Sequence, residues 1–158
     1  MTIRVGIGFD AHRLVEGREL VLGGVSIEYG RGLEGHSDGD ALLHALTDAL
    51  LGAVAAPDIG ALFPPSDSQW KNAPSRVFLE KALSIVEEKG FRTQQVDIVI
   101  IAQEPKLSGY LGSIRELLAE ILRIPGDAVG IKATTTDGMG FTGRGEGIAV
   151  QAVATVTS

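Results

Sequence analysis

The stretch Ile3-Arg4-Val5-Gly6-Ile7-Gly8-Phe9-Asp10-Ala11-His12 alternates in character and ends in two potential metal ligands. Such alternation is typical of a β-strand, on which residues two apart point to the same face. We therefore predict a strand over Ile3–Asp10 and expect the side chains of Asp10 and His12 to reach one point. This spacing is common by chance, so its meaning depends on the rest of the chain.

A predicted helix over Asp38–Ala55 carries the last of the chain's three histidines. The helix is almost entirely apolar, and its polar residues fall on one narrow stripe: Asp40, His44, Thr47 and Asp48. A solvated stripe on a surface helix is the alternative, but it fits poorly with so wide an apolar surface. Ionisable groups on a helix buried on most sides need a partner or a metal ion.

We therefore predict that Asp10, His12 and His44 bind zinc or a similar divalent ion. Two imidazoles and a carboxylate are a common set of ligands for such ions, with a fourth position open for chemistry. A carboxylate of Asp40 or Asp48 is expected to accept the second ring proton of His44.

The composition favours one soluble domain spanning residues 1–158. Hydrophobic residues make up 44%, there is no cysteine, and the net charge is −6 without a basic patch. These features argue against disulfides and nucleic-acid partners and favour a cytoplasmic location. No apolar run approaches the ~18 residues of a membrane span, and no signal peptide is evident.

The expected fold is a two-layer α/β (α+β) domain with a mixed four-stranded sheet, helices on one face, and a small hairpin. The expected elements beyond the first strand and helix are a hairpin at Leu20–Ile27, an irregular segment at Asp58–Pro74, a helix capped by Ser75 and ending at Lys89-Gly90, a strand at Val96–Ala102, a helix at Ser108–Arg123, and strands at Val129–Thr136 and Ile148–Val156. The strand at Val96–Ala102 is apolar on both faces. We therefore expect copies of the chain to cover the open face, with ligand sites between subunits.

Three loops carry polar chemistry: Asp58–Asp67, Ala102–Leu107 and Lys132–Gly147. For the first two loops, a functional role and a role as a simple connection between elements explain the residues equally well. The third offers three threonine hydroxyls and Asp137, which suit phosphate and a metal ion. Its Gly138-x-Gly140-x-x-Gly143 matches the dinucleotide fingerprint only formally, because a strand rather than a helix follows.

Together these motifs closely resemble the 2-C-methyl-D-erythritol 2,4-cyclodiphosphate synthase family of the non-mevalonate isoprenoid pathway. The resemblance covers nearly the whole chain, in segments that keep their order: Gly8-Phe9-Asp10-x-His12, Gly35-His36-Ser37-Asp38-Gly39-Asp40, His44–Leu50, Asp58-Ile59-Gly60, Ile100-Ile101-Ala102-Gln103-x-Pro105-Lys106, Lys132–Thr136 and Gly140–Gly147.

The resemblance implies conversion of 4-diphosphocytidyl-2-C-methyl-D-erythritol 2-phosphate to a cyclic diphosphate and CMP. It implies Zn²⁺ at Asp10, His12 and His44, and Mg²⁺ or Mn²⁺ on the substrate diphosphate near Asp137. It also implies a homotrimer with active sites between subunits and with Phe141 and Arg144 lining a central channel.

In the same family, His36 and Thr135 are the implied transition-state stabilisers. The implied substrate-binding residues are Asp10, Ala11, His12, His36, Ser37, Asp58, Ile59, Gly60, Phe63, Pro64, Pro65, Ser66, Asp67, Ala102, Gln103, Glu104, Pro105, Lys106, Leu107, Ser108, Thr134, Thr135, Thr136, Asp137, Phe141 and Arg144.

Three departures from the family pattern lie outside the zinc ligands. Asp137 stands where glutamate is usual, Pro65 stands where aspartate is usual, and Asn72-Ala73-Pro74-Ser75 replaces Gly-Ala-Asp-Ser. These departures change the carboxylate expected to bind the second metal ion and the groups with which the loop would contact the substrate.

Two other functions use the same residues. A metal-dependent phosphohydrolase would use water to attack the phosphorus atom, and its product would be inorganic phosphate. A trimeric binding module would use zinc structurally, but structural zinc normally has four protein ligands and only three are evident.

Overall fold

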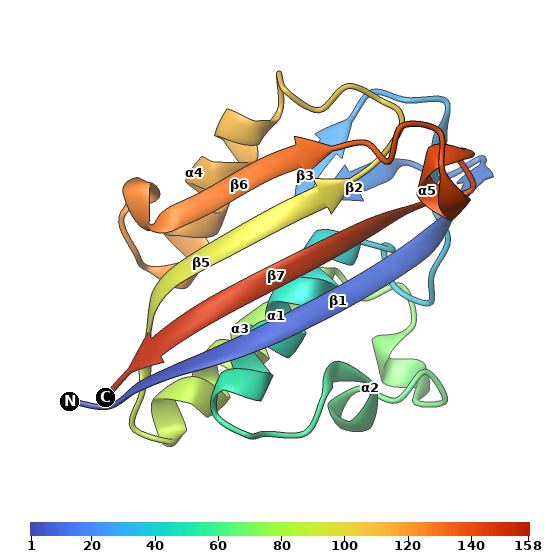
Figure 1. The fold of residues 1–158 in the computed structure, drawn as a ribbon. Helices are drawn as coiled ribbons and strands as arrows, with labels where there is room; N and C mark the ends of the chain where they lie inside the picture. The colour runs from blue at the N-terminus through green and yellow to red at the C-terminus, as the bar shows by residue number, and fades with distance from the viewer.

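The computed structural model describes residues 1–158 as a sheet of five strands with helices on one side (Figure 1). The strand order is β4-β1-β7-β5-β6, and only β5 and β6 run parallel. The strands span Ile3–Glu16 (β1), Arg31–Leu33 (β4), Arg92–Ile101 (β5), Val129–Thr134 (β6) and Gly147–Thr157 (β7). A separate hairpin pairs β2 (Leu20–Leu22) with β3 (Val25–Ile27).

Three helices form the second layer: α1 (Ala41–Ala53), α3 (Ser75–Glu88) and α4 (Leu111–Leu122). Helix α1 packs across β1 and β7, whereas α3 contacts β5 and α4 contacts β6. The shorter helical segments are α2 (Ile59–Leu62), α5 (Gly140–Gly143) and the 3₁₀ turns η1 (Ser68–Trp70) and η2 (Gly126–Ala128). None of the helices combines the length and the apolar character that crossing a membrane requires.

The two-layer fold with helices on one face is confirmed, but the predicted four-stranded sheet is wrong by one strand. The additional strand, β4, pairs with the end of β1 over Leu14–Glu16. Three residues are too short to show an alternating pattern, so nothing in the sequence indicates this strand. The predicted irregular segment also contains two short helical turns, α2 and η1.

Ser75 was expected to cap α3, and this prediction is wrong. Pro74 occupies the cap position and makes no side-chain cap hydrogen bond, while Ser75 is the first helical residue. The backbone N–H of Ser75 donates instead to Asp38 Oδ2 at 2.9 Å. A carboxylate from a distant loop thus replaces the local cap.

Helix α1 lies unusually close to β1 because two glycines on the inner face of the strand have no side chain. A Cβ on Gly6 would lie 1.9 Å from the Ala49 carbonyl oxygen, and one on Gly8 would lie 1.8 Å from that of Ala45. Gly6 and Gly8 share their face of the strand with Asp10. The helix backbone therefore rests directly on the strand that carries two of the predicted ligands.

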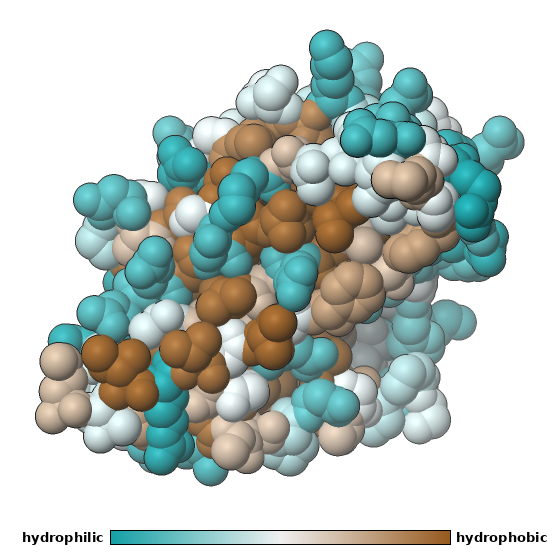
Figure 2. All heavy atoms as spheres, in the orientation of Figure 1, coloured by the Kyte–Doolittle hydropathy of each residue, from teal (hydrophilic) through white to brown (hydrophobic).

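The opposite face of β1 is an apolar stripe open to solvent. Its four large side chains, Ile3, Val5, Ile7 and Phe9, are each more than half exposed. Figure 2 shows hydrophobic residues spread over this face of the sheet. A contiguous exposed apolar surface of this kind is typical of a face that another molecule or a second copy covers.

Substitution of Gly8 by alanine tests the contact between α1 and β1. We expect Gly8→Ala to lower the free energy of unfolding by at least about 1–3 kcal/mol, because the new methyl group meets backbone rather than a flexible side chain. Chemical denaturation measures the change. Gly112→Ala is the matched control: it adds a methyl to open space on α4 and should stabilise by about 0.5–1 kcal/mol. Equal effects of the two substitutions would contradict the close packing.

Candidate metal centre and adjoining cavities

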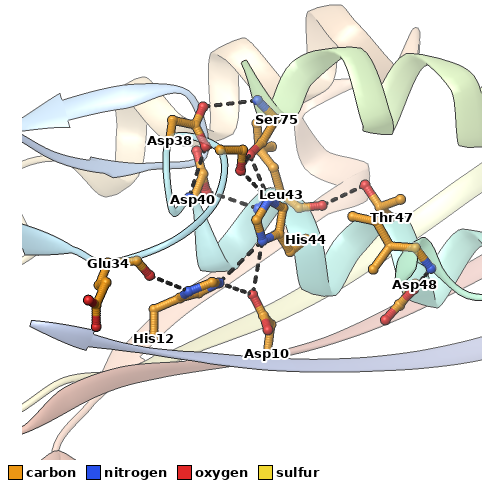
Figure 3. A network of polar contacts seen from close by, with 12 residues as sticks. Asp10, His12, Glu34, Asp38, Asp40, Leu43, His44, Thr47, Asp48 and Ser75 are labelled. Atoms are coloured by element: carbon orange, nitrogen blue, oxygen red, sulfur yellow. Dashed lines mark hydrogen bonds and ion pairs between the residues drawn. The ribbon is translucent and has the colours of Figure 1, made fainter. Parts of the chain in front are cut away.

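The three predicted ligands meet at one point between β1 and α1 (Figure 3). Asp10 Oδ2 lies 2.7 Å from His12 Nε2 and 3.1 Å from His44 Nδ1, and the two ring nitrogens lie 3.3 Å apart. Two ligands of a tetrahedral zinc ion, each bound at 2.0–2.1 Å, would be separated by about 3.3 Å. The donor set and its spacing therefore fit a small divalent cation.

The ring of His12 is oriented by a backbone carbonyl. Its Nδ1 donates to the carbonyl oxygen of Glu34 at 2.6 Å. A carbonyl oxygen can only accept, so this contact places the proton on Nδ1 and leaves the lone pair of Nε2 facing the cluster.

Asp10 and His12 stabilise each other's charged forms, so the carboxylate is held ionised and a metal ion would displace the proton from His12 Nε2. Burial would raise the pKa of Asp10, but hydrogen bonds and charge attraction from His12 and His44 outweigh it and hold the pKa below its ordinary value. Burial would lower the pKa of His12, whereas the hydrogen bond and charge of Asp10 raise it above the usual value. The site thus stabilises an ionised carboxylate facing positive charge.

The second nitrogen of His44 does not bond to Asp40 or Asp48, so that prediction is wrong. His44 Nε2 lies 2.7 Å from Ser75 Oγ and 3.2 Å from Ser37 Oγ. Both serines are buried. Ser75 is the first residue of α3, and Ser37 lies in the loop just before α1. Neither belongs to α1, which is why helical spacing pointed to the wrong partners.

The carboxylates of Asp40 and Asp48 accept backbone N–H groups instead. Fully buried Asp40 caps α1 through the N–H of Leu43 and also accepts the N–H groups of Gly23 and Gly24. Burial outweighs these bonds and raises the pKa of Asp40 to about 6. Asp48 accepts the N–H of Ile59 at 2.8 Å and so ties α2 to α1.

A cavity of about 250 Å³ opens beside the cluster. Its lining consists of His12, His36, Ser37, His44, Ile59, Gly60, Phe63, Pro65, Trp70 and Phe78. The loop Asp58–Asp67 therefore borders the same cavity as His12 and His44, through Ile59, Gly60, Phe63 and Pro65. Asp58 and Asp67 themselves accept local backbone N–H groups as helix caps.

Sequence reasoning named Phe63 but missed Trp70 and Phe78, the two rings that complete the aromatic wall of this cavity. Phe63 packs edge-on against Trp70 with ring centroids 4.9 Å apart and against Phe78 at 4.6 Å. Phe78 also lies 6.0 Å from the ring of His44. It reads as an ordinary core residue of α3, and no sequence signal separates the two roles.

Arg18 is a second residue that the sequence did not single out. Its guanidinium donates to the carbonyl oxygens of Gly35 and Ser37, at 2.9 and 2.8 Å. These two residues flank His36, so Arg18 fixes the loop that presents His36 to the cavity. A lone arginine in a turn carries no pattern from which this role could be read.

A second cavity of about 470 Å³ lies at the ends of β5 and β6. It is lined by residues that the sequence grouped in two separate loops: Ala102, Gln103, Pro105, Lys106, Leu107, Ser108, Ala133, Thr134 and Thr135. Asp137 does not line it; its side chain accepts from Thr135 Oγ1 at 3.4 Å. Gln103 Oε1 accepts the N–H of Gly138 and joins the two loops.

The two cavities do not meet within one chain. Asp10 pairs with Val150, Val150 with Ile100, and Ile100 with Ala133, so these residues form one row across the sheet. Three strand spacings separate the ends of that row by about 14 Å. The threonine run is therefore remote from the metal centre of its own chain.

Phe141 and Arg144 lie on the short helix α5 and just after it. Phe141 is 40% exposed and borders a hollow with Ala11 and Glu146. Arg144 pairs with Glu146 at 3.2 Å. Neither reaches the cavity at the metal centre.

Comparisons with known proteins agree with this geometry. The family model described as the YgbB family matches residues 3–157. The chain belongs to the YgbB family. A relative from Moorella thermoacetica, named 2-C-methyl-D-erythritol 2,4-cyclodiphosphate synthase, is 54% identical over 96% of this chain and 93% of its own length.

Other members of the family differ in length and in bound ligand. The bifunctional enzyme IspD/IspF of Novosphingobium aromaticivorans is 59% identical over 98% of this chain, which spans only 40% of that relative. A solved structure of 2C-methyl-D-erythritol-2,4-cyclodiphosphate synthase, described as a form bound to CDP, has a TM-score of 0.91 and 39% identity. The match covers 98% of this chain and 100% of that one.

Removing one imidazole tests the metal centre. We expect His44→Ala to bind far less than one Zn²⁺ per chain, because two remaining ligands hold the ion poorly, while the apolar helix still folds. Elemental analysis after dialysis measures the bound metal. His36→Ala is the matched control, since His36 lines the same cavity but is not a ligand. Full zinc occupancy in His44→Ala would remove His44 from the ligand set.

Proposed function

We propose that this chain converts 4-diphosphocytidyl-2-C-methyl-D-erythritol 2-phosphate to 2-C-methyl-D-erythritol 2,4-cyclodiphosphate and CMP. An oxygen of the 2-phosphate attacks the β-phosphorus, and the bond from that phosphorus to the CMP oxygen breaks. The observation that carries the proposal is the three-ligand cluster Asp10, His12 and His44 opening into a cavity. Relatives of similar length that bear the synthase name support it.

The ligand set suits Zn²⁺, and a bound zinc ion would supply charge neutralisation and a template for in-line attack between two anions. No protein nucleophile is needed. The chain has no cysteine, and all three histidines lie in or beside the metal centre.

The residues around the first cavity would bind the methylerythritol phosphate. Ile59 and Gly60 line it, together with the loop Phe63–Asp67 through Phe63 and Pro65. The aromatic rings shield the reacting phosphates from water. His36 would stabilise charge in the transition state, and Arg18 would keep its loop in place.

The second cavity would bind the cytidine diphosphate part of the substrate. Ala102–Ser108 and Thr134–Asp137 surround it or adjoin it, and Thr135 would act beside the reacting phosphates. Mg²⁺ or Mn²⁺ near Asp137 would neutralise the diphosphate. A family member of known structure that binds CDP supports a nucleotide in this fold.

A homotrimer would bring the two half-sites together. Within one chain they are about 14 Å apart, too far for one diphosphate to bridge. The exposed stripe of Ile3, Val5, Ile7 and Phe9 offers an apolar surface for assembly. Phe141 and Arg144 would then line a channel on the symmetry axis.

The reaction itself is the first test. Incubated with the cytidylylated substrate, Zn²⁺ and Mg²⁺, the chain should release CMP and the cyclic diphosphate in equal amounts, as measured by mass spectrometry. No inorganic phosphate should appear, because water does not take part. Release of phosphate in place of the cyclic product would identify a phosphohydrolase and contradict the proposal.

Complementation tests the shared site. His44→Ala and Thr135→Ala should each be inactive alone. Each isolated mixed trimer should recover activity at one of its three sites, since each shared site draws one half from each of two neighbouring subunits. Co-expression with two different affinity tags isolates the mixed trimers, and His44→Ala mixed with His12→Ala is the control that cannot recover. Absence of recovery in the first pair would place the whole site within one chain.

A further inference from the structure

The second ring nitrogen of His44 contacts Ser75, the first residue of α3, and Ser75 in turn bonds to Asp38 in the loop before α1; we call this pair the relay (Figure 3). We propose that Ser75, itself held by Asp38, is a positioning residue that fixes the ring of His44 for metal binding. The inference rests on the metal centre proposed above. It assigns a purpose to buried Ser75 and half-buried Asp38, which the reaction does not otherwise use.

The direction of each hydrogen bond follows from the donors available. Asp38 Oδ1 accepts the N–H of Asp40 at 3.0 Å, and Oδ2 accepts the N–H of Ser75 at 2.9 Å. Because a carboxylate can only accept, the hydroxyl proton of Ser75 also points to Asp38 Oδ1. The lone pair of Ser75 Oγ is then left to accept from His44 Nε2 at 2.7 Å.

This chain of bonds selects one tautomer of His44. With the proton on Nε2, the lone pair of Nδ1 faces Asp10 Oδ2 and His12 Nε2. A metal-binding histidine normally donates its other N–H to such a partner, which sets both tautomer and ring orientation. Ser37 Oγ lies farther from the same nitrogen, at 3.2 Å, and makes the weaker contact.

The relay also connects the metal centre to the wall of the cavity. Asp38 fixes the N-terminus of α3, which has no cap of its own. The segment between α1 and α3 carries Phe63 and Trp70, and Ser75 is where it rejoins the core. His12, in contrast, is oriented by the backbone carbonyl of Glu34, which is not part of α3. Only the His44 side of the site therefore depends on how α3 begins.

Zinc affinity of the purified chain tests the relay without an activity assay. We expect Ser75→Ala to weaken Zn²⁺ binding roughly 10–100-fold in competition with a chromophoric chelator. The visible absorption bands of bound Co²⁺ should shift as well, because the His44 ring is no longer held. Ser84→Ala is the matched control: Ser84 lies on the same helix and bonds only to the carbonyl of Glu80, so its zinc affinity should equal that of the parent.

Asp38→Asn is the second variant and keeps the volume of the side chain. Its amide can donate to Ser75 Oγ and turn the hydroxyl proton toward His44, which favours the wrong tautomer, so zinc binding should again weaken. If Ser75→Ala does not fold, this variant decides. Unchanged zinc affinity and an unchanged cobalt spectrum in the folded variants overturn the relay. A parent chain that binds no zinc overturns the metal centre itself, which is a separate failure.

Discussion

The close contact of α1 with β1 is the constraint on which the rest of the structure depends. Gly6 and Gly8 let the carbonyl groups of the helix approach the strand to distances that any Cβ would block. Four helical residues and two strand residues cover nearly the same length, about 6 to 7 Å. Every second residue of β1 therefore faces one turn of α1: Gly6 faces Ala49 and Gly8 faces Ala45. His44 is next to Ala45, so it lies close to the residues that follow Gly8 on the strand, Asp10 and His12.

The sequence was informative where one element carries the signal. Alternation along β1 and an apolar helix with a narrow polar stripe were enough to bring Asp10, His12 and His44 together. It was uninformative where the partner lies in a distant loop. Ser75 looks like a helix cap, and its actual role depends on Asp38, 37 residues away. Strand β4 depends in the same way on pairing with β1, because it is too short to show a period of its own.

One row of the sheet explains why a single chain presents two incomplete pockets. Asp10 and Ala133 stand level with each other, but β7 and β5 lie between them. Inner-face side chains of those two strands are packed under α1 and are buried. No rearrangement short of unfolding the sheet brings the threonine run to the metal ligands. The homotrimer proposed above would both cover the open apolar face of β1 and bring the two pockets of neighbouring chains together.

The buried polar groups show how this chain holds a histidine of the candidate metal centre on an apolar helix. An imidazole on α1 has few polar neighbours on its own helix, and each unpaired buried N–H would cost about 1–3 kcal/mol. Asp40 and Asp48 are already committed to backbone N–H groups, so the second nitrogen of His44 needs a partner from outside. Ser75 supplies it at the point where α3 begins. The loop that walls the cavity is therefore anchored at the residue that orients the ligand, so any displacement of that loop at its end must also move the ring of His44.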